Sequence, residues 1–297
     1  MDSTNKKIHV IINPSAGQND TILNKLNTVF HAAGVNWDVS VTHESGDATH
    51  FAHTAMRAGV DVVCAYGGDG TVMEVAHAIQ GGDVPMAILP GGTANLISVE
   101  LGIPKDLTKA AEIAISNNSV VRLVDLGKVG DDFIMLRVGV GFEGEKVKGA
   151  DRELKDRFGI LAYSIAGLKA LHESEIANYR LTIDGEVIEV EGFNCMVDNC
   201  GNFGVSGFTL SKDISVSDGL LDVIIVRDSR FRSAISTIKS IAGKQPDPES
   251  FHHWQARQIV IEASPSQLVH LDGEMWGETP VTVKVLSGVL PILTPGE

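Results

Sequence analysis

Two glycine-rich clusters stand directly behind apolar runs in the first third of the chain. Gly67-Gly68-Asp69-Gly70-Thr71 follows the run Val62–Tyr66, and Pro90-Gly91-Gly92-Thr93-Ala94-Asn95 follows Met86–Leu89. Glycine permits positive φ and close backbone approach, so successive N–H groups can point at an anion. The start of a helix adds partial positive charge. Two such turns at neighbouring strand ends favour a nucleotide's phosphates over an ordinary pair of strand-to-helix turns.

The polar side chains of the first cluster suit metal-assisted phosphate binding. The carboxylate of Asp69 would repel a phosphate on its own, so its presence suggests an intervening Mg²⁺ or water. Thr71 can donate a hydroxyl to the ligand or cap the helix. As five isolated residues, the cluster would also fit a tight turn whose Asp and Thr are ordinary caps.

Carboxylates recur later in the chain, at Asp125, Asp218-Gly219 and Asp272-Gly273-Glu274. Phosphoryl transfer needs a positioned donor, an offset of its charge, and an oriented acceptor hydroxyl, whose proton a carboxylate can accept. Local sequence alone favours hairpin turns at the two Asp-Gly pairs, and Asp125 fits a strand-end carboxylate paired with a lysine.

The elements that position the glycine clusters alternate between strand and helix. Strands are predicted at Ile8–Ile12, Trp37–Val41, Val62–Tyr66 and Met86–Leu89, and helices at Thr21–Ala33, Asp47–Met56, Val72–Ile79 and from Asn95 toward Leu101. This order predicts a parallel sheet covered by helices, which binds ligands at the carboxyl ends of its strands.

After about Asp125 the pattern becomes β-rich. Short strands are predicted at Phe133–Val140, Leu181–Val197 (folded at Asp184-Gly185), Leu220–Val226, Ile259–Glu262, Leu268–Leu271 and Val281–Val285. Two helices are expected among them, around Leu161–Leu171 and Arg230–Ile241. We therefore expect an α/β fold with an N-terminal parallel αβα domain and a C-terminal, antiparallel, sandwich-like β domain.

The composition excludes some classes of function. The 297 residues carry a formal net charge of -14, which argues against nucleic-acid binding because that requires clustered Lys and Arg. We find no signal-peptide pattern and no apolar run of about 20 residues, the length of a spanning helix. The three cysteines have no metal-site spacing and indicate free thiols in a reducing compartment, which predicts a cytoplasmic protein.

The order of motifs resembles the lipid kinases of the diacylglycerol kinase catalytic-domain family, which includes bacterial soluble diacylglycerol kinase-like proteins and the sphingosine and ceramide kinases. The resemblance covers nearly the whole chain. It rests on Asn13-Pro14-Ser15-Ala16-Gly17, the two glycine clusters, Asp125-Leu126-Gly127, Phe158–Tyr163, Ser217–Asp222 and Asp272-Gly273-Glu274.

The resemblance implies a kinase of two domains, residues 1–126 for the nucleotide and 127–297 for a lipid acceptor, with ATP in the cleft between them and the extreme C-terminus packed back on the first domain. It implies that Gly67, Gly68, Asp69, Gly70, Thr71 and Thr93 hold the phosphates, with Thr42 nearby and Asp69 in contact with Mg²⁺ through water. It also implies that Asn13, Gly17 and Asn95 shape the same nucleotide pocket, to which Gly92 belongs as well. Asp272 corresponds to the general base, with Glu274 beside it and Asp125 completing a carboxylate network. Ser215, Asp218 and the Leu220 carbonyl match a structural cation site.

The acceptor follows least directly from the sequence. An apolar stripe (Leu161, Ile165, Leu168, Leu171) suits either an acyl-chain pocket or core packing, and a cationic segment (Arg227, Arg230, Arg232, Lys239, Lys244) suits either transient contact with a membrane surface or a solvated helix face. Diacylglycerol or a related lipid is the expected substrate. The oligomeric state is open, a homodimer being one expectation.

Two other functions stay open. A soluble-substrate kinase resembling NAD kinase shares the first glycine cluster, although the C-terminal Asp272-Gly273-Glu274 counts against it. A non-catalytic lipid- or nucleotide-binding regulator is favoured by departures from the family pattern: Met73, Leu96, and Gln18-Asn19-Asp20 in place of a lysine or arginine. The retained Asp69, Asp272 and Glu274 favour an active enzyme.

Overall fold

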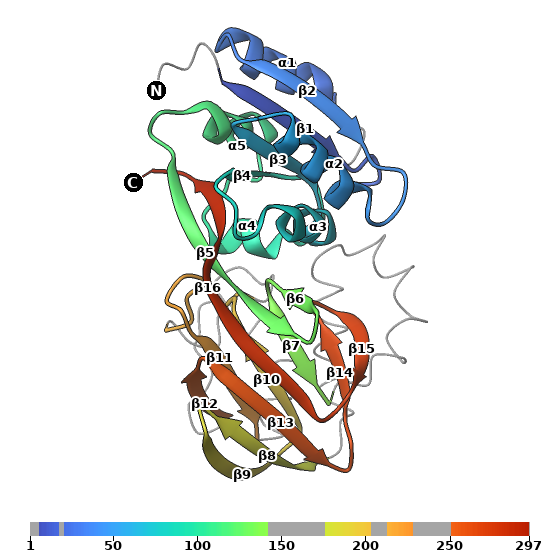
Figure 1. Ribbon diagram of the computed structural model, residues 1–297, viewed down its shortest axis with the longest axis vertical. Coiled ribbons are helices and arrows are strands. Elements are labelled where there is room, and N and C mark those ends of the chain that lie inside the picture. Colours follow the sequence, from blue (N-terminus) through green and yellow to red (C-terminus); the bar gives the residue numbers. More distant parts are fainter. Residues whose placement is uncertain (1–5, 18–20, 142–175, 203–212, 228–250, 297) are drawn as a thin grey trace, which may run out of the picture. The chain divides into compact units, whose positions relative to one another are not determined.

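The computed structural model describes residues 6–17, 21–141, 176–202, 213–227 and 251–296 (Figure 1). The chain divides into two compact units. The first comprises residues 1–124 and 288–297, and the second residues 125–287.

The first unit contains a parallel sheet. Its strands are β1 (Lys7–Ile12), β2 (Asn36–Val41), β3 (Val62–Gly67) and β4 (Met86–Pro90), in the order β2-β1-β3-β4. The last part of β16 (Val281–Thr294) adds a further parallel partner beside β4, where Ile292 pairs with Met86. β3 and β4 are buried throughout, as expected for a sheet with both faces covered.

The helices of this unit pack in two pairs, α1 with α5 and α2 with α3. They are α1 (Ile22–Ala32), α2 (Asp47–Arg57), α3 (Asp69–Ile79), α4 (Leu96–Glu100) and α5 (Leu107–Ile115). Each longer helix buries one apolar stripe; in α1 this is Leu26, Val29 and Phe30. Helix α5 was not predicted; Asp106 caps it by accepting the N–H of Lys109 at 2.9 Å.

The strand order creates a natural binding position at one edge of this sheet. From β1 the chain passes to β2 on one side and then returns to β3 on the other side of β1. Because crossovers between parallel strands are right-handed, the two connecting helices lie on opposite faces and leave a crevice beyond the carboxyl ends of β1 and β3. The residues that follow these ends are Asn13 and the first glycine cluster.

The second unit is built from antiparallel strands in two sheets. One contains β13 (Gln258–Ser264), β8 (Ala177–Ile183), β9 (Glu186–Gly192) and the first part of β16, with β5 (Val120–Val129) paired to β16 and to β6 (Asp132–Ile134). The other has the order β12 (Phe251–Ala256), β11 (Leu221–Val226), β10 (Asn194–Asp198), β7 (Arg137–Val140), β14 (Leu268–Leu271), β15 (Glu274–Glu278).

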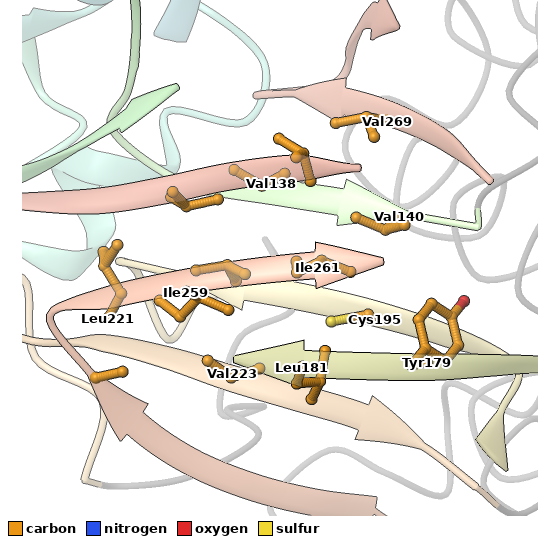
Figure 2. Packing of buried hydrophobic residues seen from close by; sticks show 14 of the residues in the cluster. Val138, Val140, Tyr179, Leu181, Cys195, Leu221, Val223, Ile259, Ile261 and Val269 are labelled. Atoms are coloured by element: carbon orange, nitrogen blue, oxygen red, sulfur yellow. The ribbon is translucent and has the colours of Figure 1, made fainter. Parts of the chain in front are cut away.

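The core of this unit lies between the inward faces of the two sheets (Figure 2). Alternate residues of each strand contribute to it, among them Val138, Leu181, Val223 and Ile261, all fully buried. The predicted fold class, a parallel α/β domain followed by an antiparallel sandwich-like domain, is thus confirmed.

Several element boundaries differ from the prediction. The strand expected over Phe133–Val140 is interrupted at Met135 and Leu136, because the amides of these residues turn to the side chain of Asp272. The strand expected at Val281–Val285 continues to Thr294. β5, β12 and β15 were not predicted. The two helices expected around residues 161–171 and 230–241 lie outside the described residues.

Among the residues that the structure describes, no helix is both long enough and apolar enough to span a membrane.

Candidate functional site

A hydrogen bond joins the ends of β1 and β3. Asn13 Nδ2 donates to Thr71 Oγ1 at 3.0 Å, and the Asn13 N–H donates to the Tyr66 carbonyl at 2.9 Å. The other amide atom of Asn13, Oδ1, accepts the N–H of Ser15 at 2.9 Å and folds the turn that follows β1. Asn13 therefore fixes the side chain of Thr71 at the first turn of α3.

The two glycine clusters are in direct contact. The N–H groups of Gly91 and Gly92 both donate to the Gly67 carbonyl, at 2.9 and 3.0 Å. A Cβ placed on Gly92 would lie 2.5 Å from the Gly68 Cα, and one on Gly67 would collide with the side chain of Thr71. These glycines are thus required by backbone packing, in addition to any role toward a ligand.

Asn95 shapes the second cluster from within. It has a left-handed backbone (φ 51°), its Oδ1 accepts the Gly92 N–H at 3.1 Å, and its Nδ2 donates to the Gly92 carbonyl at 2.6 Å. Thr93, between them, is exposed. The turn therefore exposes Thr93 to solvent, and Asn95 holds the backbone of the turn.

Gly17 has a second explanation that the sequence did not reveal. Its φ is 86°, and a Cβ there would collide with the Tyr66 hydroxyl. A Cβ on Gly91 would lie 2.8 Å from the same ring. The buried ring of Tyr66 thus fills the space between these two glycines.

Asp69 is placed to bind a positively polarised group. Its Oδ1 is buried without a hydrogen-bond partner within the described part of the chain. Burial raises the pKa of Asp69, and backbone N–H groups at the start of α4, those of Ile97, Leu96 and Asn95, oppose this rise. A buried carboxylate oxygen with an unused lone pair suits a water molecule or a hydrated cation.

A cavity of about 460 Å³ opens beside these turns, within the first unit. Of the residues predicted to bind nucleotide it is lined by Asn13, Thr42, Gly70 and Thr71. Gly67, Gly68, Gly92 and Asn95 instead lie in the packed turns described above. The remaining lining residues, which were not predicted to bind the nucleotide, are Pro14, Ser15, His43, Glu44, Ser45, Ala48 and Glu74.

Glu74 is the most informative of the residues that were missed. Its Oε2 accepts the N–H groups of Gly46 and Ala48 at 3.0 and 3.1 Å, and its Oε1 accepts the Ser45 hydroxyl at 3.3 Å. It therefore caps α2 from α3 and fixes one wall of the cavity. The available signal was its position three residues after Thr71, which places both side chains on one face of α3.

In the second unit, Asp272 occupies a two-residue hairpin turn between β14 and β15. Both Asp272 and Gly273 have positive φ (46° and 93°), the conformation of a type I′ turn. Its carboxylate accepts three backbone N–H groups: Met135 to Oδ2 at 2.9 Å, Leu136 to Oδ1 at 3.0 Å and Arg137 to Oδ1 at 2.8 Å. Burial raises the pKa of Asp272 to about 6, opposed by these hydrogen bonds and by the Arg137 guanidinium.

Asp125 is nearly fully buried and contacts the loop that precedes β11. Its Oδ2 accepts the Gly219 N–H at 2.7 Å, and its own N–H donates to the Val216 carbonyl at 2.7 Å. In that loop Asp218 Oδ1 accepts the Leu220 N–H at 3.0 Å, and Ser215 Oγ lies 3.4 Å from the Ser217 nitrogen.

The predicted cation site has suitable chemistry. Burial raises the pKa of Asp218, and the nearby Asp222 and Asp125 raise it further, so negative charge accumulates at this loop. A hydroxyl, a carboxylate and a carbonyl are the hard oxygen donors that Mg²⁺ or Ca²⁺ prefers. In the described part of the chain, no group of three or more His, Cys, Asp or Glu side chains is arranged to hold a metal ion.

Asn199, which the sequence analysis did not single out, connects Asp125 with the loop that holds Asp272. It is fully buried, and its Nδ2 donates to the carbonyls of both Asp125 and Met135, each at 2.9 Å. The three predicted catalytic residues thus differ in their settings: Asp272 and Asp125 are anchored in one hydrogen-bonded region, and Glu274 is exposed at the start of β15.

Two family models match the chain. The diacylglycerol kinase catalytic domain matches residues 7–129, and the YegS C-terminal NAD kinase beta sandwich-like domain matches residues 137–294. Together they cover both units.

Individual relatives extend over nearly the full chain. A Bacillus subtilis protein named diacylglycerol kinase is 29% identical over 93% of this chain and 92% of its own. An Escherichia coli protein named "Probable lipid kinase YegS" is 31% identical over 88% of this chain and 87% of its own. A crystal structure of a diacylglycerol kinase from Bacillus anthracis has a TM-score of 0.74 at 26% identity and covers 97% of each chain.

Proposed function

Because the chain belongs to the diacylglycerol kinase catalytic-domain family and is a kinase, we propose that it transfers the γ-phosphoryl group of ATP, with Mg²⁺, to a hydroxyl of diacylglycerol or a related lipid. The observation that carries this proposal is the junction of Asn13 and Thr71 beyond β1 and β3, where an αβα sheet binds its ligands. The cavity beside it, about 460 Å³, has the size of a small-molecule site.

The nucleotide end of the reaction is assigned to the first unit. Thr71 and the N–H groups at the start of α3 would receive phosphate oxygens, since a helix N-terminus favours anions. Asp69 would hold Mg²⁺ through a water at its unpartnered Oδ1. When bound, Mg²⁺ offsets the negative charge of the phosphates. Ser215, Asp218 and the Leu220 carbonyl would hold a second, structural cation in the other unit.

The acceptor end is assigned to Asp272. Within the residues that the structure describes, Oδ1 accepts two hydrogen bonds and Oδ2 accepts one, so Oδ2 keeps a lone pair for the proton of an acceptor hydroxyl. A base needs to be ionised at the working pH, and the pKa of about 6 meets that condition at pH 7. Glu274 lies two residues away and Asp125 supports the same region through Asn199.

The lipid character of the acceptor is supported by the residues that follow Asp272. Met275 and Trp276 are exposed (59% and 40%), directly after Glu274 on β15, the edge strand of its sheet. Trp276 Nε1 donates to Asp132 Oδ2 at 2.8 Å, so its polar edge is engaged and the ring is left for apolar contact. Large apolar side chains with one polar group, tryptophan above all, are typical of lipid–water interfaces. The apolar stripe and most of the cationic segment considered in the sequence lie outside the described residues.

A soluble-substrate kinase is the second candidate, because the family model for the second unit is described as NAD kinase beta sandwich-like. One assay separates the two functions: transfer of labelled γ-phosphate from Mg-ATP to diacylglycerol, monoacylglycerol, phosphatidylglycerol, sphingosine or ceramide in mixed micelles, with NAD as the soluble acceptor. We expect label on a lipid. Label on NAD alone would support the soluble-substrate kinase, and ATP binding without transfer would support a regulator.

A further inference from the structure

Arg137 is bonded to the proposed base through its own backbone. Its N–H donates to Asp272 Oδ1 at 2.8 Å, and its carbonyl accepts the Asp272 N–H at 3.0 Å. Arg137 is also the first residue of β7, directly after the two residues whose amides complete the cradle of the Asp272 carboxylate. Any shift of Arg137 along the strand therefore moves all three donors of that cradle.

The side chain of Arg137 is held in place at several points. Its Nε lies 3.3 Å from Asp198 Oδ1, and its Nη2 donates to the Asn202 carbonyl at 2.9 Å and the Cys200 carbonyl at 3.4 Å. Asp198 is fully buried, and only 19% of the arginine side chain is exposed. These partners fix the orientation of the planar guanidinium. The flexible ammonium group of a lysine could not make the same set of contacts.

Asp198 depends on this arginine for its charge. It faces Asp222 across the β10–β11 pair, and both carboxylates are fully buried. Asp222 Oδ1 has His253 Nε2 at 2.6 Å, whereas neither oxygen of Asp198 has a hydrogen bond within the described residues. The ion pair with Arg137 thus compensates the negative charge of Asp198. Displacement of the guanidinium would leave this buried carboxylate without a counter-charge.

We propose that Arg137 is a positioning residue for Asp272: its anchored side chain fixes the strand start whose amides hold the base, and its charge favours the ionised carboxylate. This inference rests on the proposed function, in which Asp272 accepts the proton of the lipid hydroxyl. Among the described residues, the charged groups linked to this pair are Asp198, and behind it Asp222 and His253. Loss of the arginine side chain leaves Asp272 partly buried, with a weakened cradle and without the favourable charge of the guanidinium.

The test compares Arg137→Met, Arg137→Gln and Arg137→Lys with Arg180→Met as the matched control. Arg180 is an exposed arginine of the same unit that pairs with Glu262 at 3.1 Å. In lipid-kinase assays we expect Arg137→Met to lower kcat about tenfold or more and to move the acid limb of the kcat profile upward by about one pH unit, with unchanged Kd for ATP. Arg137→Lys retains the positive charge. It should therefore restore the pH of the acid limb more completely than it restores kcat.

A readout without turnover keeps this inference separate from the proposed function. Carboxyl-¹³C NMR of aspartate-labelled protein gives the pKa of Asp272, with Asp272→Asn identifying the resonance. We expect a higher pKa in Arg137→Met and, if that variant does not fold, in Arg137→Gln, which lacks the charge but retains hydrogen-bond donors for the carbonyls. An unchanged pKa in the folded variants, equal to that in Arg180→Met, would overturn the inference, even if the wild-type protein phosphorylates lipid. An inactive wild-type protein in which the pKa still responds would instead count against the proposed function alone.

Discussion

Asp272 has two structural roles, one through its backbone and one through its carboxylate. Its positive φ closes a two-residue hairpin, a conformation for which aspartate before glycine is favoured, and its carboxylate bridges to three amides at the start of β7. The bridging bonds stabilise the ionised form, and burial stabilises the neutral form. The balance leaves a carboxylate that changes charge close to neutral pH, as a general base requires.

The activity should depend on pH through the ionisation of Asp272. Because only ionised Asp272 can accept a proton, and its pKa is raised by burial to about 6, we expect kcat to be full above pH 7 and to fall as the pH drops through about 6. Rates of lipid phosphorylation at saturating ATP, measured from pH 5 to pH 8, give this profile. A rate that stays constant down to pH 5 would show that Asp272 is not the base.

A pair of glycine substitutions separates packing from ligand approach. A Cβ at Gly92 meets the Gly68 Cα at 2.5 Å, so Gly92→Ala should cost about 1–3 kcal/mol in stability and also weaken ATP binding. A Cβ at Gly70 meets nothing within 4 Å but enters the cavity, so Gly70→Ala should keep the Tm and weaken ATP binding about tenfold, which is about 1.4 kcal/mol.

Thermal unfolding and calorimetric titration with Mg-ATP provide both values for each variant. Gly277→Ala is the control, because Gly277 lies in the other unit with open space around a Cβ. Wild-type ATP affinity in Gly70→Ala would exclude close approach of the phosphates to this backbone.

At the scale of elements, the cap that α3 provides for α2 shapes the cavity. Glu74 accepts the N–H groups of Gly46 and Ala48, and Thr49 Oγ1 donates back to the Glu74 carbonyl at 2.7 Å. The N-cap residue itself is Gly46, which has no side chain to satisfy these donors. Glu74, on a neighbouring helix, thus supplies the hydrogen-bond acceptor that the N-terminus of α2 lacks.

Removal of this cap should have a measurable cost. We expect Glu74→Ala to lower the free energy of unfolding by about 1 kcal/mol, the usual value of an N-cap, and to weaken ATP binding because one cavity wall loosens. Urea denaturation compares it with Glu112→Ala, an exposed glutamate on α5. Equal stabilities of the two variants would contradict the capping role.

The hairpin of β14 and β15 should be the element that meets lipid. We expect the fluorescence of the wild-type protein to be quenched by vesicles of brominated phosphatidylcholine containing diacylglycerol, since Trp276 is 40% exposed beside Met275. In Trp276→Phe, which keeps Trp37 and Trp254, the quenching should be largely lost. Undiminished quenching in this variant would place the lipid contact elsewhere on the chain.

Much of this element structure followed from local pattern. Strands β1, β3 and β4 contain apolar runs that are followed by Asn13 or by a glycine-rich turn, so the parallel sheet and its ligand edge could be predicted. The interruption at Met135 and Leu136 could not be predicted. Its cause is the Asp272 carboxylate, which lies 137 and 136 residues further along the chain. Asn199 and Arg137 were missed for the same reason: each acts through partners that only the tertiary fold brings near. Glu74 differs from them, because its spacing from Thr71 could be read in the sequence.

At the scale of the whole molecule, two strands run from one unit into the other. β5 begins in the first unit and ends in the second, and β16 passes from the second to the first, so that residues 288–297 rejoin the N-terminal unit. The family models follow the same division, with the catalytic-domain model on residues 7–129 and the sandwich-like model on 137–294. Nucleotide binding and base catalysis are thereby proposed for different units of one chain.

The most direct test of this account is γ-phosphoryl transfer from Mg-ATP to diacylglycerol in mixed micelles by the wild-type protein and by Asp272→Asn, with Mg-ATP affinity measured for both. We expect a phosphorylated lipid with the wild-type protein and a rate about 10²–10⁴-fold lower with the variant, at equal affinity for Mg-ATP, because the residues proposed to bind the nucleotide lie in the other unit. Equal rates for the two proteins, or no transfer to any lipid hydroxyl by a wild-type protein that binds Mg-ATP, would contradict it.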